Sequence, residues 1–268
     1  MKKLLTYILI GILLISFGGC AKKENAINSN NKKVIKVGAS AVPHSEILNE
    51  VKEDLAKEGY TLEVVIFSDY VLPNTALNEG QLDANFFQHV PYLEEFNKNK
   101  GTNLVWTTKV HIEPLGIYSK KIKSLNDLKS GATITIPNDP TNGSRALKLL
   151  EKSGLIKLDS KGLVNKQNIK ENSKNLNIKE IDAPQLPRTL EDSEIAVINT
   201  NYAISAGLNP VKDALILEDK DSPYANVIAV KKGNENEPWV KALDKALTSE
   251  KVKKFISEKY NNSVMPAF

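Results

Sequence analysis

The sequence predicts an α/β fold arranged in two blocks, and three observations indicate it. From Val34 onward, short runs rich in β-branched residues alternate with segments of helical periodicity. These runs are apolar on both faces, as parallel strands covered by helices are, and a second alternating series begins at residue 132. The chain of 268 residues, 41% apolar and 25% charged, is long enough for one large or two ordinary domains.

The first block is predicted to begin as a βαβ unit with a right-handed crossover. Its second helix follows Ser68 and Asp69, and the Asp69 carboxylate can accept hydrogen bonds from free N–H groups of the first helical turn. The expected elements are strands at 34–40, 61–67, 84–87, 104–108 and 114–119, and helices at about 44–57, 70–78 and 91–98.

The second block is predicted to open with a strand at 132–137, a turn at 138–144 and a helix at 145–154 that ends at Gly154. A helix N-terminus after such a turn offers free backbone N–H groups and the positive end of the helix dipole, which suit a carboxylate or a phosphate. The remaining expected elements are strands at 177–181, 195–199, 214–218 and 227–232, the last in a returning chain, and helices at about 238–247 and 251–259.

The first twenty residues differ from the rest of the chain and predict export. A positively charged start precedes an apolar run at 4–15, which is too short to span the roughly 30 Å of membrane hydrocarbon. Two glycines and Cys20 follow, and this resembles the lipobox cut by bacterial lipoprotein signal peptidase. We therefore expect a lipoprotein signal peptide at 1–19, lipidation of Cys20 and a disordered tether at 20–33. The alternative is an ordinary secretory signal with an incidental cysteine.

Charge and motifs exclude several classes of function. The chain has 36 basic and 32 acidic residues, and this small excess argues against a nucleic-acid partner. Its single cysteine excludes an intramolecular disulfide and a cysteine-based structural zinc site. Dinucleotide, P-loop, zinc-protease and serine-hydrolase motifs are absent from the sequence, and His111-Ile112-Glu113 lacks the paired cysteines of a zinc deaminase. We therefore expect no catalytic residues, no metal and no cofactor.

The polar and aromatic residues suit a free amino acid instead, which needs a cation for its carboxylate, acceptors for its ammonium and a pocket for its side chain. Arg145 could grip a carboxylate with both arms of its guanidinium, although an isolated helical arginine is more often solvated. Asn142, Asn199 and Asn226 could supply amide contacts. The chain also has a dense aromatic cluster, of which we expect at least two members to be core residues. Its members are Tyr70, Phe86, Phe87, His89, Tyr92 and Tyr118.

Six segments closely resemble the methionine-binding lipoprotein family, the substrate-binding components of methionine ABC importers. They follow the order found in the family and span about residues 36 to 232, whereas roughly the last 30 residues match only in helical character. The segments are SDYVLPN (68–74), DANFFQHVPYL (83–93), PNDPTN (137–142), APQLPR (183–188), VINT (197–200) and DKDSPYAN (219–226).

The resemblance implies a two-lobe periplasmic-binding-protein fold, with the ligand between the lobes and two crossover segments as the hinge. Lobe one would comprise residues 34–118 and 224–268, and lobe two residues 119–223. It further implies a lipid-anchored protein on the extracytoplasmic face of the cell membrane, not an enzyme, which captures methionine and delivers it to the permease and ATPase of an ABC importer. L-methionine is the leading ligand, while D-methionine, a Met-containing peptide or another amino acid stays open.

The resemblance also implies roles for individual residues. Arg145 would bind the carboxylate with help from Asn142, while Asn199 and Asn226 would hold the head group. An aromatic slot favours methionine, because its polarizable sulfur gains about 0.3 to 1.5 kcal/mol beside a ring, but such a slot would not exclude leucine. The residues expected around the ligand side chain are Tyr70, Phe87, His89, Tyr92 and Tyr118.

Two other functions stay open at this point. A metal-binding lipoprotein could use three histidines and a carboxylate as zinc ligands. Those residues are His44, His89, His111 and Glu113, although His89 lies inside a family motif and no spacing joins the others. An extracytoplasmic enzyme of amino-acid metabolism could use the same two-lobe scaffold, because a fold alone does not settle function.

Overall fold

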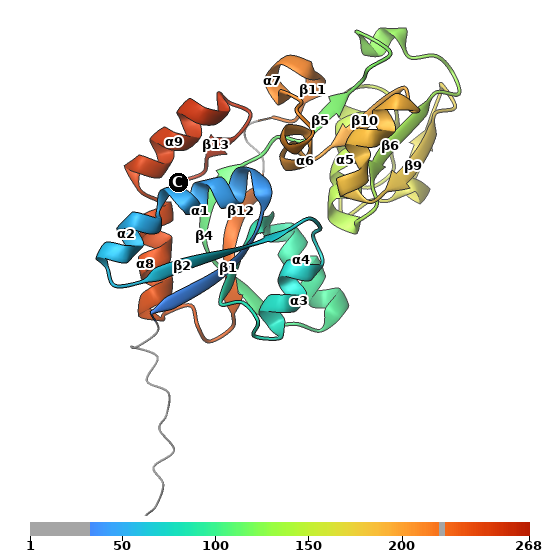
Figure 1. Ribbon diagram of the computed structural model, residues 1–268. Coiled ribbons are helices and arrows are strands. Elements are labelled where there is room, and N and C mark those ends of the chain that lie inside the picture. Colours follow the sequence, from blue (N-terminus) through green and yellow to red (C-terminus); the bar gives the residue numbers. More distant parts are fainter. Residues whose placement is uncertain (1–32, 220–222) are drawn as a thin grey trace, which may run out of the picture. The chain divides into compact units, whose positions relative to one another are not determined.

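The computed structural model describes residues 33–219 and 223–268. The expected signal peptide at 1–19, the lipidation site Cys20 and nearly all of the expected tether lie outside the described residues. Within the described part, the chain forms two mixed β-sheets flanked by helices and a small two-stranded sheet (Figure 1). No helix in these ranges is both long enough and apolar enough to cross a membrane.

The first sheet combines the predicted first block with the C-terminal part of the chain. In spatial order its strands are β13 (Met265–Pro266), β4 (Leu104–Ile112), β12 (Ala225–Lys231), β3 (Ala84–His89), β1 (Val34–Ser40) and β2 (Thr61–Phe67). β1 pairs in parallel with β2 and β3, whereas β12 runs antiparallel to β3 and β4. The expected return of the chain to the first block is therefore confirmed.

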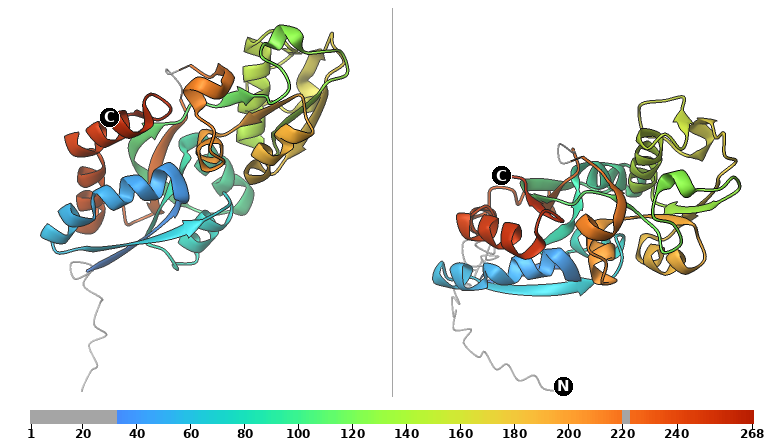
Figure 2. Two further views of the ribbon diagram at one scale, coloured as in Figure 1. Left: turned by 45° about the horizontal axis from the view of Figure 1, so that its top comes forward. Right: turned by 90° about the horizontal axis from the view of Figure 1, so that it is seen from above.

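Helices pack on the first sheet in two groups. They are η2 (Ala41–Ser45), α1 (Glu46–Glu50), α2 (Lys52–Lys57), α3 (Leu72–Asn78), α4 (Val90–Lys100), α8 (Pro238–Leu247) and α9 (Glu250–Tyr260). One apolar cluster joins β1 to α1, α2, α8 and α9, with α9 against α1 and α8 against α2 (Figures 1 and 2). A smaller cluster joins α3 and α4 to the sheet.

Local backbone geometry and a capping side chain set where two of these helices begin. The helix expected at 44–57 is divided at Val51, whose backbone angles of φ −99° and ψ 0° are not helical. Asp69 acts as expected before α3, because its Oδ1 atom accepts the N–H groups of Val71 and Leu72 at 2.7 and 2.8 Å.

The second sheet holds the middle of the chain. In spatial order its strands are β11 (Ala214–Leu217), β5 (Gly116–Tyr118), β10 (Ile195–Ile198), β6 (Thr133–Pro137) and β9 (Asn177–Ile181). The sequence predicts residues 114–119 as the last strand of the first block, but β5 pairs antiparallel with β10 and β11. Residues 116–118, assigned to lobe one on resemblance, therefore lie in the second sheet, since its strands take their backbone hydrogen bonds.

The middle of the chain also contains one long helix, α5, and several short helices and strands outside the second sheet. They are η3 (Leu125–Asp127), α5 (Pro140–Lys152), β7 (Lys157–Leu158), η4 (Lys166–Asn168), β8 (Ile169–Glu171), η5 (Ala183–Glu191), α6 (Thr200–Ser205) and α7 (Pro210–Asp213). The chain passes from the first sheet to the second between β4 and β5, and returns between β11 and β12.

α5 begins earlier than the sequence pattern predicts. A turn is expected up to residue 144, yet the helix starts at Pro140, because the Asp139 carboxylate accepts the N–H of Asn142 at 2.9 Å and proline needs no N–H partner in the first turn. Asn142 and Arg145 therefore lie three residues apart on one helical face. The opposite side of α5 packs Leu147 into the apolar cluster of the second sheet.

Candidate functional site

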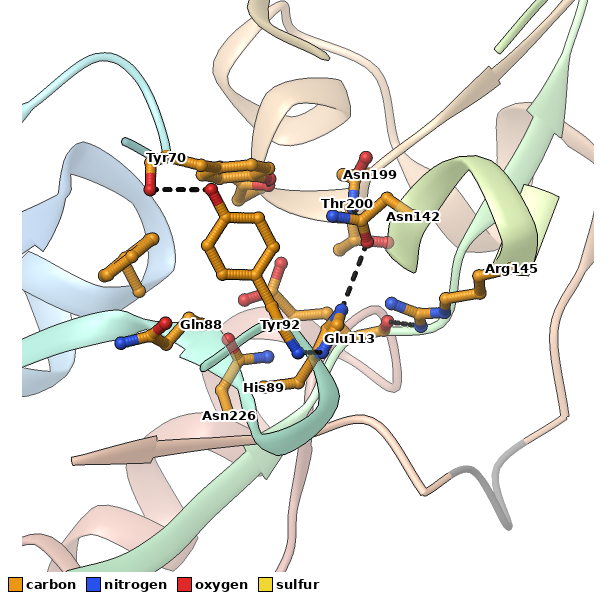
Figure 3. Close-up of a pocket in the computed structure, with 12 residues that line it drawn as sticks. Tyr70, Gln88, His89, Tyr92, Glu113, Asn142, Arg145, Asn199, Thr200 and Asn226 are labelled. Carbon is orange, nitrogen blue, oxygen red and sulfur yellow. Dashed lines mark hydrogen bonds between the residues drawn. The ribbon is translucent and has the colours of Figure 1, made fainter. Parts of the chain in front are cut away.

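A cavity lies between residues of the first sheet and residues of the second (Figure 3). The space between its lining atoms, open solvent included, is about 340 Å³. Its lining residues are Tyr70, Phe87, Gln88, His89, Tyr92, Glu113, Asn142, Arg145, Asn199, Thr200, Asn201 and Asn226. They include every ligand-binding residue expected from the sequence except Tyr118.

Strand ends and helix starts supply most of these side chains. His89 ends β3 and precedes α4, and Asn199 follows β10 and precedes α6. β6 runs directly into the loop before α5, which carries Asn142 and Arg145. Ligands of open α/β sheets bind at the carboxyl ends of strands, and this cavity lies at such ends.

Arg145 is buried and held from three sides, which rules out the solvated alternative. Its side chain is 4% exposed, and its Nε atom lies 2.9 and 3.0 Å from the two carboxylate oxygens of Glu218. Its Nη2 atom donates to the backbone oxygen of Glu113 at 2.7 Å and to Glu218. The ring of Tyr224 lies 4.3 Å from the guanidinium carbon. These contacts fix the guanidinium plane at the cavity wall.

Asn142 connects both sheets through its amide. Its Nδ2 atom donates to both oxygens of Asp139 at 3.1 and 3.0 Å, and its Oδ1 atom accepts from Asn199 Nδ2 at 3.0 Å. The same oxygen lies 3.2 Å from His89 Nε2. Because His89 Nδ1 accepts the N–H of Tyr92, its Nε2 carries the hydrogen and donates to Asn142.

Two further features of this polar group bear on ligand binding. Burial, with the nearby Arg145 charge, lowers the pKa of His89 to about 3, so this imidazole is neutral. The Oδ1 atom of Asn199 is buried and lacks a hydrogen-bond partner among the described residues. An unpaired buried acceptor is costly, and a donor brought by a ligand would satisfy it.

Three aromatic rings form one wall of the cavity. The ring centroids of Tyr70, Phe87 and Tyr92 lie about 6 Å from one another. Tyr92 donates its hydroxyl to the backbone oxygen of Tyr70 at 2.9 Å, and the Tyr70 hydroxyl donates to Asn201 Oδ1 at 2.6 Å. The wall from the first sheet is therefore hydrogen-bonded to the start of α6 beside the second sheet.

The remaining members of the aromatic cluster are core residues. Tyr118 is 1% exposed, packs among Leu186, Leu190 and other apolar residues of the second sheet, and is not one of the residues that line the cavity. Phe86 is fully buried in the main cluster of the first sheet. This agrees with the expectation that at least two of the six residues serve in packing.

Glu113 and two histidines form a buried cluster next to the cavity. The Oε1 atom of Glu113 lies 2.8 Å from His111 Nε2 and 3.3 Å from His44 Nε2. His44 Nε2 also lies 3.2 Å from Asn226 Oδ1. Three of the four residues weighed as metal ligands thus come together, whereas His89 is bound to Asn142.

The sequence interpretation missed four lining residues. Gln88 lies inside the DANFFQH segment, and Thr200 and Asn201 lie at or beside the VINT segment, so the motifs that identified their neighbours contain the signal. The sequence places Glu113 only in possible zinc sites, and no spacing in the sequence connects it to a ligand pocket.

A family model described as NlpA lipoprotein matches residues 35–268. The chain belongs to the NlpA lipoprotein family. Among the relatives of this NlpA lipoprotein, the methionine-binding lipoprotein MetQ of Bacillus subtilis is 46% identical over 278 residues, covering 99% of each chain.

Solved structures also resemble this NlpA lipoprotein in sequence and in fold. A nutrient-binding protein from Burkholderia cenocepacia, solved bound to methionine, superposes with a TM-score of 0.85 at 48% identity and covers 87% of this chain and 100% of its own. A periplasmic substrate-binding protein of an ABC transporter from Coxiella burnetii superposes with a TM-score of 0.84 at 44% identity, covering 87% and 100%. The expected family and the two-lobe fold are confirmed.

Proposed function

We propose that this NlpA lipoprotein is the substrate-binding component of an ABC importer and captures methionine in the cavity between the two sheets. The observation that carries the proposal is the cavity itself, which presents a fixed guanidinium, a group of amides and an aromatic wall. A relative solved with methionine bound, at 48% identity, supports the choice of ligand.

The head group of the ligand is assigned to the polar side of the cavity. Arg145 binds the carboxylate, since its plane is already held by Glu218 and the Glu113 carbonyl, and little side-chain entropy is lost on binding. Asn142, one turn earlier on α5, lies beside it. Asn199 and Asn226 complete the set of amides around the head group.

The side chain of the ligand is assigned to the aromatic wall. Tyr70, Phe87 and Tyr92 present rings about 6 Å apart, with His89 at the edge of Tyr92. An unbranched thioether fits against such rings and gains about 0.3 to 1.5 kcal/mol from sulfur–aromatic contact. Tyr118 is left out of the proposed site because it packs in the second sheet.

The cellular context follows from the same assignment. The family is a lipoprotein family, and we infer anchoring through acylated Cys20 on the extracytoplasmic face of the membrane, where the loaded protein delivers methionine to a permease and its ATPase. The relatives are named for binding and transport, so we do not propose an enzyme.

Calorimetric titration tests the proposal. The purified protein, unfolded and refolded to remove any ligand carried from the cell, is titrated with L-methionine, D-methionine, leucine and a Met-containing dipeptide. We expect one equivalent of methionine to bind, with leucine weaker because it is branched and lacks sulfur. Failure of both methionine enantiomers to bind refolded protein with a native circular dichroism spectrum would refute the assigned ligand.

A further inference from the structure

Glu113 lines the cavity and has no part in the contacts proposed above for methionine. Glu113 is 6% exposed and lies between β4 and β5, where the chain leaves the first sheet. Of the described residues that line the cavity, Arg145 and Glu113 are the ones with a guanidinium or a carboxyl group. One positive and one negative group on the wall match the two charges of an amino-acid zwitterion.

Two neutral imidazoles hold one oxygen of this carboxylate. Burial lowers the pKa of His44 to about 4 and that of His111 to about 3, so each ring carries one N–H at neutral pH. In both rings Nε2 faces Glu113 Oε1, at 3.3 and 2.8 Å, and therefore carries the hydrogen. The Ser40 hydroxyl, 2.6 Å from His44 Nδ1, then donates to that nitrogen and fixes the tautomer.

The carboxylate still needs a positive partner. Burial raises the pKa of Glu113, while His44, Arg145 and the backbone N–H of Asn201 oppose this shift. Both imidazoles bind Oε1 and the backbone N–H of Asn201 also donates to the carboxylate, yet the two oxygens together offer about four acceptor positions, so a further donor can bind. A buried carboxylate is stable as an ion only when it is paired and hydrogen-bonded.

We propose that Glu113 accepts the ammonium group of the bound amino acid, and that His44 and His111 are positioning residues that hold its carboxylate at the cavity. This inference rests on the proposed function, because it takes the ligand carboxylate to lie at Arg145. It makes the site selective for ligands with a free α-amino group, against deaminated or N-acylated analogues.

The arrangement of charges agrees with this assignment. Arg145 Nη2 lies 2.7 Å from the backbone oxygen of Glu113, so the two charged residues are neighbours. The carboxylate and ammonium of an α-amino acid are joined through a single carbon and require such neighbours. The charges then alternate in sign along one row, in the order Glu218, Arg145, ligand carboxylate, ligand ammonium and Glu113.

A metal ion at the same three side chains is the competing explanation. Atoms bound to one tetrahedral zinc at about 2.0 Å are separated by about 3.3 Å. The 2.8 Å between His111 Nε2 and Glu113 Oε1 is instead a hydrogen-bond distance. The 3.3 Å between His44 Nε2 and Glu113 Oε1 equals the zinc separation, so the shorter contact alone favours a hydrogen-bonded carboxylate over a metal ligand, and the experiment below includes the metal as an outcome.

The test compares Glu113→Gln with the wild-type protein, using L-methionine and its deaminated analogue, methylthiobutanoic acid. Dissociation constants come from calorimetry, and from protein-detected NMR titration where binding is weak. Loss of a charge-assisted hydrogen bond should weaken L-methionine binding by about tenfold to a hundredfold. Binding of the deaminated analogue should stay within about threefold of wild type or improve, because the variant no longer buries an unmatched charge.

A matched control and the supporting variants sharpen the result. Glu194→Gln changes a half-buried carboxylate just before β10 that accepts the backbone N–H of Thr133 at 3.1 Å, and should leave both constants unchanged. His44→Gln and His111→Gln should weaken L-methionine selectively, by less than Glu113→Gln does. If Glu113→Gln does not fold, Glu113→Asp replaces it, with the same selective loss expected.

Three outcomes would overturn the inference. Equal weakening of both ligands would make Glu113 structural, and an unchanged affinity for L-methionine would remove it from the site. Loss of wild-type binding after dialysis against EDTA, restored by zinc, would make the cluster a metal site. If wild-type protein does not bind L-methionine at all, the proposed function fails first, and the two failures are thereby distinguished.

Discussion

Replacing Arg145 by alanine tests the proposed carboxylate contact most directly. The side chain is 4% exposed and donates to the Glu218 carboxylate and to the Glu113 backbone oxygen. Its removal leaves the ligand carboxylate in a buried cavity without a cation. It also leaves Glu218 without this partner, although that side chain is 17% exposed and can be partly solvated.

The size of the effect follows from burial. Removing one partner of a buried ion pair costs about 3 to 5 kcal/mol. At about 1.4 kcal/mol for each factor of ten, the dissociation constant for methionine should rise by about 140-fold to 4000-fold. The dissociation constant of Arg145→Lys should lie between those of wild type and Arg145→Ala, because lysine keeps the positive charge. Its ammonium lacks the planar guanidinium that can contact Glu218, the Glu113 carbonyl and a ligand at the same time.

Calorimetry gives the dissociation constants, and urea unfolding without ligand separates any loss of stability from the loss of binding. Lys152→Ala is a matched control, since Lys152 is on the same helix and pairs with Asp219 but is 56% exposed. Lys152→Ala should change the free energies of unfolding and of methionine binding by no more than about 0.5 kcal/mol. A folded Arg145→Ala protein that binds methionine within tenfold of wild type would refute the assigned contact.

Three further predictions concern the opposite wall, the pH dependence and the anchor. Asn226→Ala should keep the wild-type circular dichroism spectrum but lose the methionine-induced rise in Tm; a full rise would remove Asn226 from the site. The pKa of Glu113 is raised by burial without ligand, and a bound ammonium lowers it, so affinity should be full above the raised pKa and fall as pH drops through it. The other groups around Glu113 are His44, His111, Arg145, Tyr70, Tyr202 and Tyr260. The pKa values of His44 and His111 are about 4 and 3, and those of the three tyrosines are raised, so none of these groups titrates near neutral pH. A wild-type affinity that does not change with pH, as expected for Glu113→Gln, would contradict the prediction for Glu113. Cys20→Ala should appear in the soluble fraction, and a variant that stays with membranes would place the anchor elsewhere.

Short sequence segments carry most of the residues expected to bind the ligand, and these residues line one cavity. Asn142 lies at the end of PNDPTN and Arg145 three residues later, and both line the cavity. The start of α5 was misplaced because a run of turn-forming residues is also a helix start. Asp139 caps the helix and Pro140 fits its first turn, so the same residues serve both structures.

Tyr118 shows the limit of assigning roles by resemblance alone. A tyrosine near other aromatic residues can face a ligand or a core, and the sequence does not distinguish these. Strand pairing decides: β5 joins β10 and β11, and Tyr118 then packs on Leu186 within the second sheet. A pairing partner many residues away leaves no mark in the local pattern of residues 114–119.

The sequence by itself determined the alternation of strands and helices, the family, and the residues that lie in short, ordered motifs. Periodicity and capping act over a few residues and can be read locally. Only the tertiary structure decided that Glu218 holds Arg145 across 73 residues and that His44 meets Asn226 across 182. It also brought His111 and Glu113 to His44 in a buried group. Such contacts depend on how sheets pack and where the chain crosses between them, since burial and charge are properties of neighbours in space.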